Sequence, residues 1–337
     1  MLFKSLLKVC FPVFAIASSL PAETDSVFYG NPPENNSSAF RIYALGDYLY
    51  WQALESNLEY VMKQSHSSSL GVKASVSELD NPFKDGFRIG AGAVFPSYYW
   101  QLEFNWTKFD HGFTDSRMQV FGTNPALIAL WMHPEIPGFP TWSRASFNWD
   151  LDFNTIDFDL LRLGFTGATL SFTPRIGLKR AWINQHVHIR YGRSDGYYDA
   201  RFTNNFRGLG PRMGFDMRMM AKWGFSFSAS AGTALLYGPF SLHRVDVSSL
   251  FLSSGINLKE YVYRFKPMMQ GLFFVEWSRS FSPAICKLSL ALGVEGQVWF
   301  GQNQLRTFVS SALPPSNLKA NGNLILQGLT AHARFDF

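Results

Sequence analysis

Apolar and polar residues alternate strictly at the end of the chain. Leu329, Ala331, Ala333, Phe335 and Phe337 fall on one side of an extended backbone, and polar residues stand between them. A period of two residues predicts a β-strand with one apolar and one polar face. The sequence therefore predicts a half-buried strand over 324–337.

The same alternation recurs through the rest of the chain. Besides the last segment, it covers 40–53, 86–95, 98–106, 145–165, 170–178, 209–221, 225–237, 269–277 and 286–300. These segments give ten predicted strands. Asp157 and Asp159 interrupt the fourth, 145–165, because they fall on the face that carries Phe147 and Phe153. Either a β-bulge or a turn explains them, and such a turn, or an extra strand at 58–62, makes the number twelve or more.

The predicted connections alternate in length. Short turns are expected near Pro96, Gly167, Trp223 and Pro283. Long connections are expected at 54–85, 108–143, 184–206, 239–263 and 301–322. Short periplasmic turns and long external loops are typical of outer-membrane barrels. The sequence therefore predicts an all-β fold over 40–337, a transmembrane antiparallel up-and-down β-barrel with long extracellular loops. In such barrels the last strand is read during assembly, so Phe335 and Phe337 are the predicted assembly signal.

The first 39 residues do not share this pattern. Lys4 and Lys8 precede an apolar run at 9–16, and small residues lead to Ala22. This arrangement predicts a signal peptide over 1–22, followed by a flexible lead-in over 23–39. We expect export through the periplasm to the bacterial outer membrane.

Composition agrees with a membrane barrel. Aromatic residues make up 17% of the chain and charged residues 16%, against about 25% charged in ordinary globular proteins. No later apolar run reaches the ~18 residues of a membrane helix. Removing Lys4 and Lys8 from 30 Lys and Arg leaves 28 against 25 acids, a charge of +3 that gives no reason to expect nucleic acid. Cys286 is then the single cysteine, so neither an intramolecular disulfide nor a cysteine-based metal site is expected.

Two pairs of polar residues have a spacing that can support a chemical site. His186 and His188 share one side of an extended segment, a spacing that can bind a metal, but no acid or cysteine stands close in sequence. Asp150 and Asp152 share a predicted inner face, as paired catalytic carboxylates do, but solvated charges are expected in a barrel lumen. No nucleophile elbow or phosphate loop is present in the sequence. We therefore expect no metal, no cofactor and no enzymatic activity.

The charged residues predicted to face the lumen are the main functional candidates. The pore-lining candidates are Arg88, Glu103, Asp150, Asp152, Arg162, Arg175, Lys179, Arg212, Asp216, Arg218, Glu276, Lys287 and Glu295. Counting all predicted inner positions, twelve basic residues oppose eight acidic ones. Rings of charge bias the ions that enter a pore. The alternative is that these charges pair and fill the lumen, since small barrels are filled by side chains.

Several blocks resemble the pore-forming, major outer-membrane-protein-like porins of Legionella and the Chlamydia-related bacteria. They are Gly46-Asp47-Tyr48-Leu49-Tyr50-Trp51-Gln52-Ala53 with Leu58-Glu59-Tyr60, Gly86-Phe87-Arg88-Ile89-Gly90-Ala91-Gly92, and the stretches 149–157 and 174–183. Beyond residue 200 only the strand rhythm and the terminal Phe agree. The resemblance implies an outer-membrane channel for small solutes. The single mature cysteine departs from the major chlamydial porins.

The sequence thus predicts a porin that passes small hydrophilic solutes by diffusion, with weak anion selectivity. The alternative is a non-conducting barrel that acts as a surface adhesin or structural envelope protein through its loops. A barrel enzyme such as an outer-membrane hydrolase is a third hypothesis. The expected partners are the outer-membrane bilayer, the assembly machinery, small solutes or ions and, as an option, further copies of the chain. Strand count, pore size and solute identity are left open.

Overall fold

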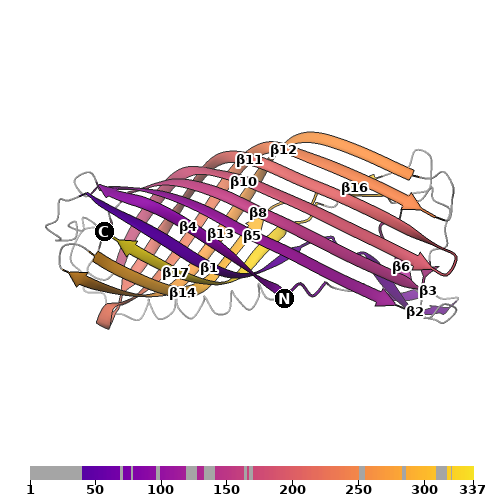
Figure 1. Cartoon of the computed structure of the whole chain (residues 1–337), viewed down its shortest axis with the longest axis horizontal. Helices are drawn as coiled ribbons and strands as arrows, with labels where there is room; N and C mark the ends of the chain where they lie inside the picture. The colour runs from indigo at the N-terminus through magenta and orange to yellow at the C-terminus, as the bar shows by residue number, and fades with distance from the viewer. Residues whose placement is uncertain are drawn as a thin grey trace.

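A closed antiparallel barrel dominates the computed structural model (Figure 1). The structure describes residues 40–68, 71–76, 79–95, 99–118, 127–132, 141–162, 165–166, 170–249, 255–282, 286–308, 317–319 and 321–337. The expected signal peptide and lead-in lie outside the described residues, as do 96–98, 167–169 and 283–285 in three of the four predicted short turns. No helix in the described part of the chain is long and apolar enough to cross a membrane.

Ten long strands build the barrel, as predicted. They are β1 (Arg41–Glu55), β4 (Phe83–Phe95), β5 (Trp100–Met118), β8 (Arg144–Arg162), β10 (Leu170–Arg193), β11 (Gly196–Met220), β12 (Phe225–Ser248), β13 (Gly255–Ser282), β14 (Cys286–Trp299) and β17 (Leu324–Asp336). Each pairs with the next, and β17 pairs with both β14 and β1, which closes the ring. The short β9 (Phe165–Thr166) pairs with β10.

Smaller elements lie at the two ends of the barrel. β2 (Val61–Ser68), β3 (Gly71–Val76), β6 (Leu127–Ala129) and β7 (Thr141–Trp142) form a separate four-stranded sheet, and β15 (Arg306–Phe308) pairs with β16 (Asn317–Lys319). The 58–62 region thus adds no barrel strand. At the opposite end, η2 (Lys222–Gly224) turns the chain between β11 and β12, with Trp223 at φ 61° and Gly224 at φ 80°. The C-terminus lies at this second end, which we assign to the periplasm (Figure 1).

An apolar band covers the outer wall near the periplasmic end. On β11 and β12 the alternate residues that the sequence predicts to face outward are exposed: Leu209, Met213, Phe215, Met219, Phe225, Phe227, Leu235 and Tyr237. Side chains between them, such as Arg212 and Ser226, are buried. Lipid solvates the first set, so the predicted alternation of faces is correct in this part of the barrel.

The strands continue well beyond the lipid-facing band. β10 has 24 residues, which at about 3.3 Å per residue and a tilt near 40° gives a height of roughly 60 Å. The apolar band of such barrels is only about 25 Å tall. About half of the barrel therefore projects outside the membrane on the extracellular side.

Two segments that were predicted to be loops are strands in this projecting part of the barrel. The loop expected at 184–206 consists of the ends of β10 and β11, which face each other across a turn at 194–195. The loop expected at 239–263 is largely the continuation of β12 and β13. The prediction failed because a strand above the membrane no longer needs an apolar outer face, so its alternation stops resembling that of a lipid-facing strand.

Strand β8 shows most directly how the apolar face changes sides outside the membrane. Trp149, Leu151 and Phe153 were expected to face lipid, but they point inward and are almost fully buried. Asp157 and Asp159 share their face, and the pairing of β8 with β5 and β10 runs without a shift. There is neither a bulge nor a turn at these aspartates. Instead, one inner face changes from apolar outside the membrane to charged inside it.

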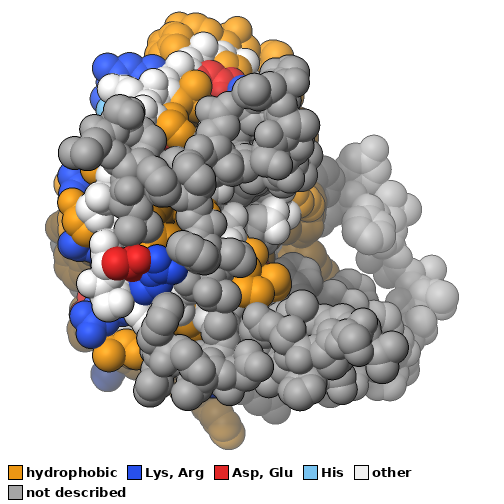
Figure 2. All heavy atoms as spheres, turned by 90° about the vertical axis from the view of Figure 1, so that its right-hand side faces the viewer, with side chains coloured by type: hydrophobic (Ala, Val, Ile, Leu, Met, Phe, Trp, Pro, Cys, Tyr) orange, Lys and Arg blue, Asp and Glu red, His pale blue; other side chains and the backbone are white. Residues whose placement is uncertain are grey.

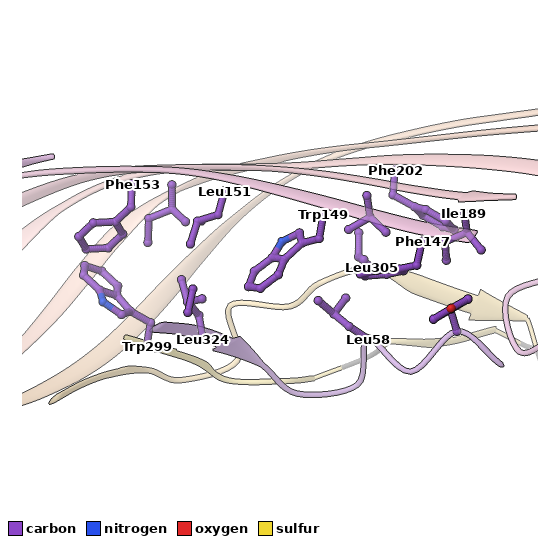
Figure 3. Packing of buried hydrophobic residues seen from close by; sticks show 14 of the residues in the cluster. Leu58, Phe147, Trp149, Leu151, Phe153, Ile189, Phe202, Trp299, Leu305 and Leu324 are labelled. Carbon is purple, nitrogen blue, oxygen red and sulfur yellow. The ribbon is translucent and has the colours of Figure 1, made fainter. Parts of the chain in front are cut away.

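The inward apolar side chains form one continuous core in the extracellular half (Figure 3). Phe153 packs edge-on against Trp299, with ring centroids 5.6 Å apart. Trp51 and Phe109 are 5.7 Å apart, and Trp149 adjoins them through His111. The segments on either side of this core are far apart in the sequence, so the core fixes how the barrel walls face each other.

Replacing Trp149 tests how much this core contributes to the stability of the barrel. We expect Trp149→Ala to destabilise the barrel by about 3–5 kcal/mol, because a large buried ring is lost and leaves a cavity. Trp149→Phe keeps most of the ring, and the indole N–H has no hydrogen-bond partner among the described residues, so this variant should stay close to wild type. The measurement is the midpoint of thermal or urea unfolding in detergent, followed by heat-modifiable gel mobility. Equal midpoints for Trp149→Ala and wild type would contradict the inward position of Trp149.

Candidate functional site: the barrel lumen

The membrane half of the lumen is filled by ion pairs between facing strands. On β4, the Arg88 guanidinium contacts Asp47 of β1 at 2.8 Å and Glu295 of β14 at 2.7 Å. Asp47 also contacts Nδ1 of His332 on β17 at 2.5 Å. Glu295 accepts a hydrogen bond from Thr330 at 3.2 Å. Four strands are therefore connected through one buried arginine.

A second network occupies the other side of the lumen. Lys179 of β10 lies 2.9 Å from Asp157, and Arg212 of β11 lies 3.2 Å from Asp157 and 2.6 Å from Asp159. Arg175 contacts Asp159 at 3.3 Å and also pairs with Asp216. The Asp159 carboxylate is completely enclosed. Burying a charge is tolerated when partners of opposite charge surround it, as they do here.

Nearer the periplasm, polar side chains continue to fill the barrel. Glu103 accepts hydrogen bonds from the Tyr43 hydroxyl at 2.7 Å and from Asn105 at 2.8 Å. Arg218 of β11 contacts Glu276 of β13 at 2.6 Å. Lys287 is half-buried and interacts electrostatically with both members of that pair.

The boundary between the charged and apolar zones is formed by cations stacked on rings. The Lys179 ammonium lies 5.9 Å from the centroid of Trp299, and the Arg88 guanidinium 5.8 Å from that of Trp51. Both rings belong to the apolar core. Such contacts are favourable when they are shielded from water, so they join the two zones without an unpaired charge at the boundary.

Three of the expected lumen residues lie on the outer wall instead. Asp150 and Asp152 point away from the lumen; Asp152 contacts Lys108 at 2.5 Å and Asp150 binds Asn148. Arg162 is exposed and stacks on Trp100 at the periplasmic end of the outer wall. For these residues the expectation was wrong, because the inner face of β8 was assigned from its extracellular part. The structure places the others on the inner face: Arg88, Glu103, Arg175, Lys179, Arg212, Asp216, Arg218, Glu276, Lys287 and Glu295.

Sequence reasoning assigned Asp157 and Asp159 to the wrong face. Both appeared as errors in an apolar face, yet they are the acids that neutralise Lys179 and Arg212. Asp157 and Asp159 are an even number of residues from Phe153, so all three side chains lie on the same face of the strand. Once Phe153 is known to point inward, the two aspartates point inward as well. Moving Arg162 out and exchanging Asp150 and Asp152 for these two acids lowers the excess of basic over acidic residues in the predicted inner set from four to three.

Two of the titratable groups buried in the extracellular half, His111 and Glu55, are shifted towards their uncharged forms. Burial lowers the pKa of His111 to about 4, and its ring lies between Phe109 and Trp149. Burial raises the pKa of Glu55 to about 8, so its carboxyl group is largely protonated at neutral pH. Both groups are therefore mostly uncharged at pH 7, which suits the apolar surroundings.

The two histidines weighed as a metal pair lie on the outer wall. His188 Nε2 is 2.8 Å from Asp199, and His186 contacts Thr203 at 3.4 Å. Within the described residues, no cluster of three or more His, Cys, Asp and Glu side chains is arranged to hold a metal ion.

Comparisons with known proteins place this geometry in context. Residues 32–337 match the family described as Legionella pneumophila major outer membrane protein precursor. A search of curated proteins gave no match. Among solved structures, the outer membrane protease OmpT from Escherichia coli is similar at 11% identity, covering 90% of this chain and 99% of that chain, with a TM-score of 0.34. The Pseudomonas putida toluene transporter TodX has 7% identity, with 88% and 89% covered and a TM-score of 0.20.

Two aspartates on β8 test the sidedness of the lumen. Asp159→Asn removes the charge that faces Arg212 and Arg175, and we expect it to destabilise the barrel by about 3–5 kcal/mol because buried cations lose their partner. Asp152→Asn makes the same change on the outer wall, where we expect less than about 1 kcal/mol. Unfolding midpoints of the two variants in the same detergent provide the measurement. A greater loss for Asp152→Asn would reverse the assignment of faces.

Proposed function

The chain belongs to the family of the Legionella pneumophila major outer membrane protein, and we propose that it is a closed outer-membrane barrel that presents a structural or adhesive surface outside the cell. The observation that carries this proposal is the filled lumen. Buried ion pairs occupy its membrane half. An apolar core occupies its extracellular half (Figure 3).

The cost of opening the lumen supports this proposal. Each large apolar side chain contributes about 1.5–3 kcal/mol when it is buried. A solute path through the core would expose several of them, for example Trp149, Phe153 and Trp299, which are all inaccessible to solvent. Exposing four such residues costs at least ~6 kcal/mol, so the open fraction would be below about 10⁻⁴.

The extracellular half also suits a surface role. Its outer wall carries polar side chains, such as Asn148, Asp150 and Asp152 on β8, and a four-stranded sheet lies at its tip. The wall is rigid because each long strand is hydrogen-bonded along its length to neighbours. A rigid polar surface held above the membrane can bind a partner without paying the cost of ordering flexible loops.

The second candidate function is the diffusion channel for small hydrophilic solutes predicted from the sequence. The inner-face charges of the membrane half favour it, and so does the resemblance to pore-forming porins. Conduction would require the apolar core to move aside. The remaining excess of basic residues supports weak anion selectivity for such a channel.

Planar-bilayer recordings discriminate between these candidates. For the purified, refolded protein we expect no stepwise conductance, and liposomes that contain it should swell no faster than empty ones. Stepwise conductance in the wild type would contradict the closed barrel and support the channel. In that case Arg212→Glu combined with Arg218→Glu should shift the reversal potential in a KCl gradient towards cation preference. An unchanged reversal potential would exclude this wall from the conducting path.

The terminal aromatic residues provide a separate prediction about assembly. The Phe337 backbone N–H donates to the Ile42 carbonyl at 2.9 Å, and its ring meets that of Phe335 at 4.8 Å. We propose that these residues form the signal for insertion, so deletion of Phe337 should reduce the outer-membrane level of the protein several-fold while export continues. Deletion of Trp223, an exposed aromatic at a periplasmic turn, is the control. Wild-type insertion without Phe337 would contradict the proposal.

A further inference from the structure

The outer wall carries an uneven distribution of charge at and above the extracellular edge of the lipid-facing band. Arg180, Arg207 and Lys259 are exposed on β10, β11 and β13, and His186 and His243 lie among them on the same wall. We call these five residues the basic patch. Figure 2, which views the extracellular end, shows Lys and Arg side chains spread along one flank of the wall.

The strand register places the members of the basic patch in two groups on the wall. Arg207 is the cross-strand partner of Trp182, two residues from Arg180. His186 pairs with Thr203, Thr203 with His243, and His243 with Lys259, so these residues follow one hydrogen-bonded row over four strands. Arg180 and Arg207 are diagonal neighbours, about 7–8 Å apart. The row of His186, His243 and Lys259 crosses β11 at Thr203, four residues and roughly 13 Å from Arg207, so a headgroup that carries two phosphates can reach both groups.

Aromatic rings lie beside the basic patch: Tyr237 and Phe265 continue the cross-strand row of Arg180, and Tyr261 and Tyr263 lie between Lys259 and that row. Tyr237 lies 4.7 Å from Phe265 and 5.6 Å from Tyr263, and both Tyr261 and Tyr263 are more than half exposed. A belt of exposed tyrosines marks the level of the lipid headgroups. The basic patch therefore lies at the height where the headgroups of the outer leaflet meet the barrel wall.

His186 is the cross-strand partner of Asp150 on β8, but the three Arg and Lys side chains of the patch have no acidic partner in the described part of the chain. Within it, no ion pair involves Arg180, Arg207 or Lys259; Arg180 stacks on Trp182 at 4.7 Å. Lys108 offers a direct contrast. It lies on the same outer wall, in the row Lys108–Asn154–Trp182–Arg207, but it contacts Asp110 at 2.8 Å and Asp152 at 2.5 Å. The neighbouring Arg201 and His188 likewise bind Asp199.

We propose that the basic patch binds the phosphorylated headgroup of an outer-leaflet glycolipid. The cations supply charge complementarity, and the guanidinium groups of Arg180 and Arg207 can donate paired hydrogen bonds to phosphate oxygens. The exposed rings beside them would contact the same lipid where its headgroup meets its acyl chains. This site lies on the outer wall, so it is independent of whether the lumen conducts.

The test uses full-length refolded protein in a neutral detergent and fluorescent, diphosphorylated lipid A as the probe. The variant combines Arg180→Gln, Arg207→Gln and Lys259→Gln. Each cation near an anionic headgroup strengthens binding roughly fivefold, so Kd should rise about a hundredfold in the triple variant. Lys108→Gln is the matched control, and its Kd should stay within about twofold of wild type, because Lys108 is already neutralised. Far-UV circular dichroism and heat-modifiable mobility must match wild type for both variants.

Three results would overturn the assignment. One is an unchanged Kd in the triple variant, and another is an equal loss in Lys108→Gln. The third is wild-type binding of dephosphorylated lipid A that is as tight as that of the phosphorylated form. A further arm adds inorganic phosphate to distinguish a lipid site from a site for free phosphate. We expect a large excess of it to leave the labelled lipid bound, and complete displacement would assign the patch to free phosphate instead.

Discussion

The structure depends on the pairing of charges that face a narrow, enclosed lumen. A barrel of ten strands leaves little space for water between its walls, so a charge on the inner face needs a partner on another strand. Arg212 illustrates the requirement: it contacts both Asp157 and Asp159 on β8. Removing one member of such an ion pair lowers the free energy of unfolding by more than the intact pair contributes to it, since the remaining charge stays buried without a partner. These networks therefore specify how the walls face each other as well as closing the lumen.

The same strands pass through two environments, and this limits what periodicity can show. In the membrane, lipid demands an apolar outer face, so the faces of β4, β11 and β12 could be predicted from sequence. Outside it, water contacts the outer face and the apolar side chains move to the interior. Trp149 and Phe153 follow the second rule and Asp157 follows the first, on one unbroken strand. The two-residue period is identical in the parts of β8 inside and outside the membrane. The position of the membrane surface therefore cannot be predicted from the sequence of β8 alone.

The ion-pair partners of the lumen charges could not be predicted from the sequence, for a different reason. The two-residue alternation assigned Arg88 to the inner face correctly. It cannot indicate that Arg88 contacts Glu295, which is 207 residues away in the sequence. That contact depends on ring closure by β17, which sets β14 and β1 on either side of it. The predicted charge excess consequently gave a picture of free charges lining a pore, whereas the structure shows most of them engaged in pairs.

Extending the strands above the membrane also changes where this protein can meet its surroundings. Residues that the sequence assigned to loops, such as His186, Arg201 and Lys259, instead occupy fixed positions on a hydrogen-bonded wall. Fixed positions allow neighbouring strands to differ in charge. Asp150 and Asp152 lie on β8, near Lys108, whereas Arg180, Arg207 and Lys259, which form no ion pair within the described residues, lie on β10, β11 and β13. Flexible loops would average such a difference, but a sheet maintains it. With an apolar core behind it, the outer wall can carry chemical specificity whether or not the lumen opens.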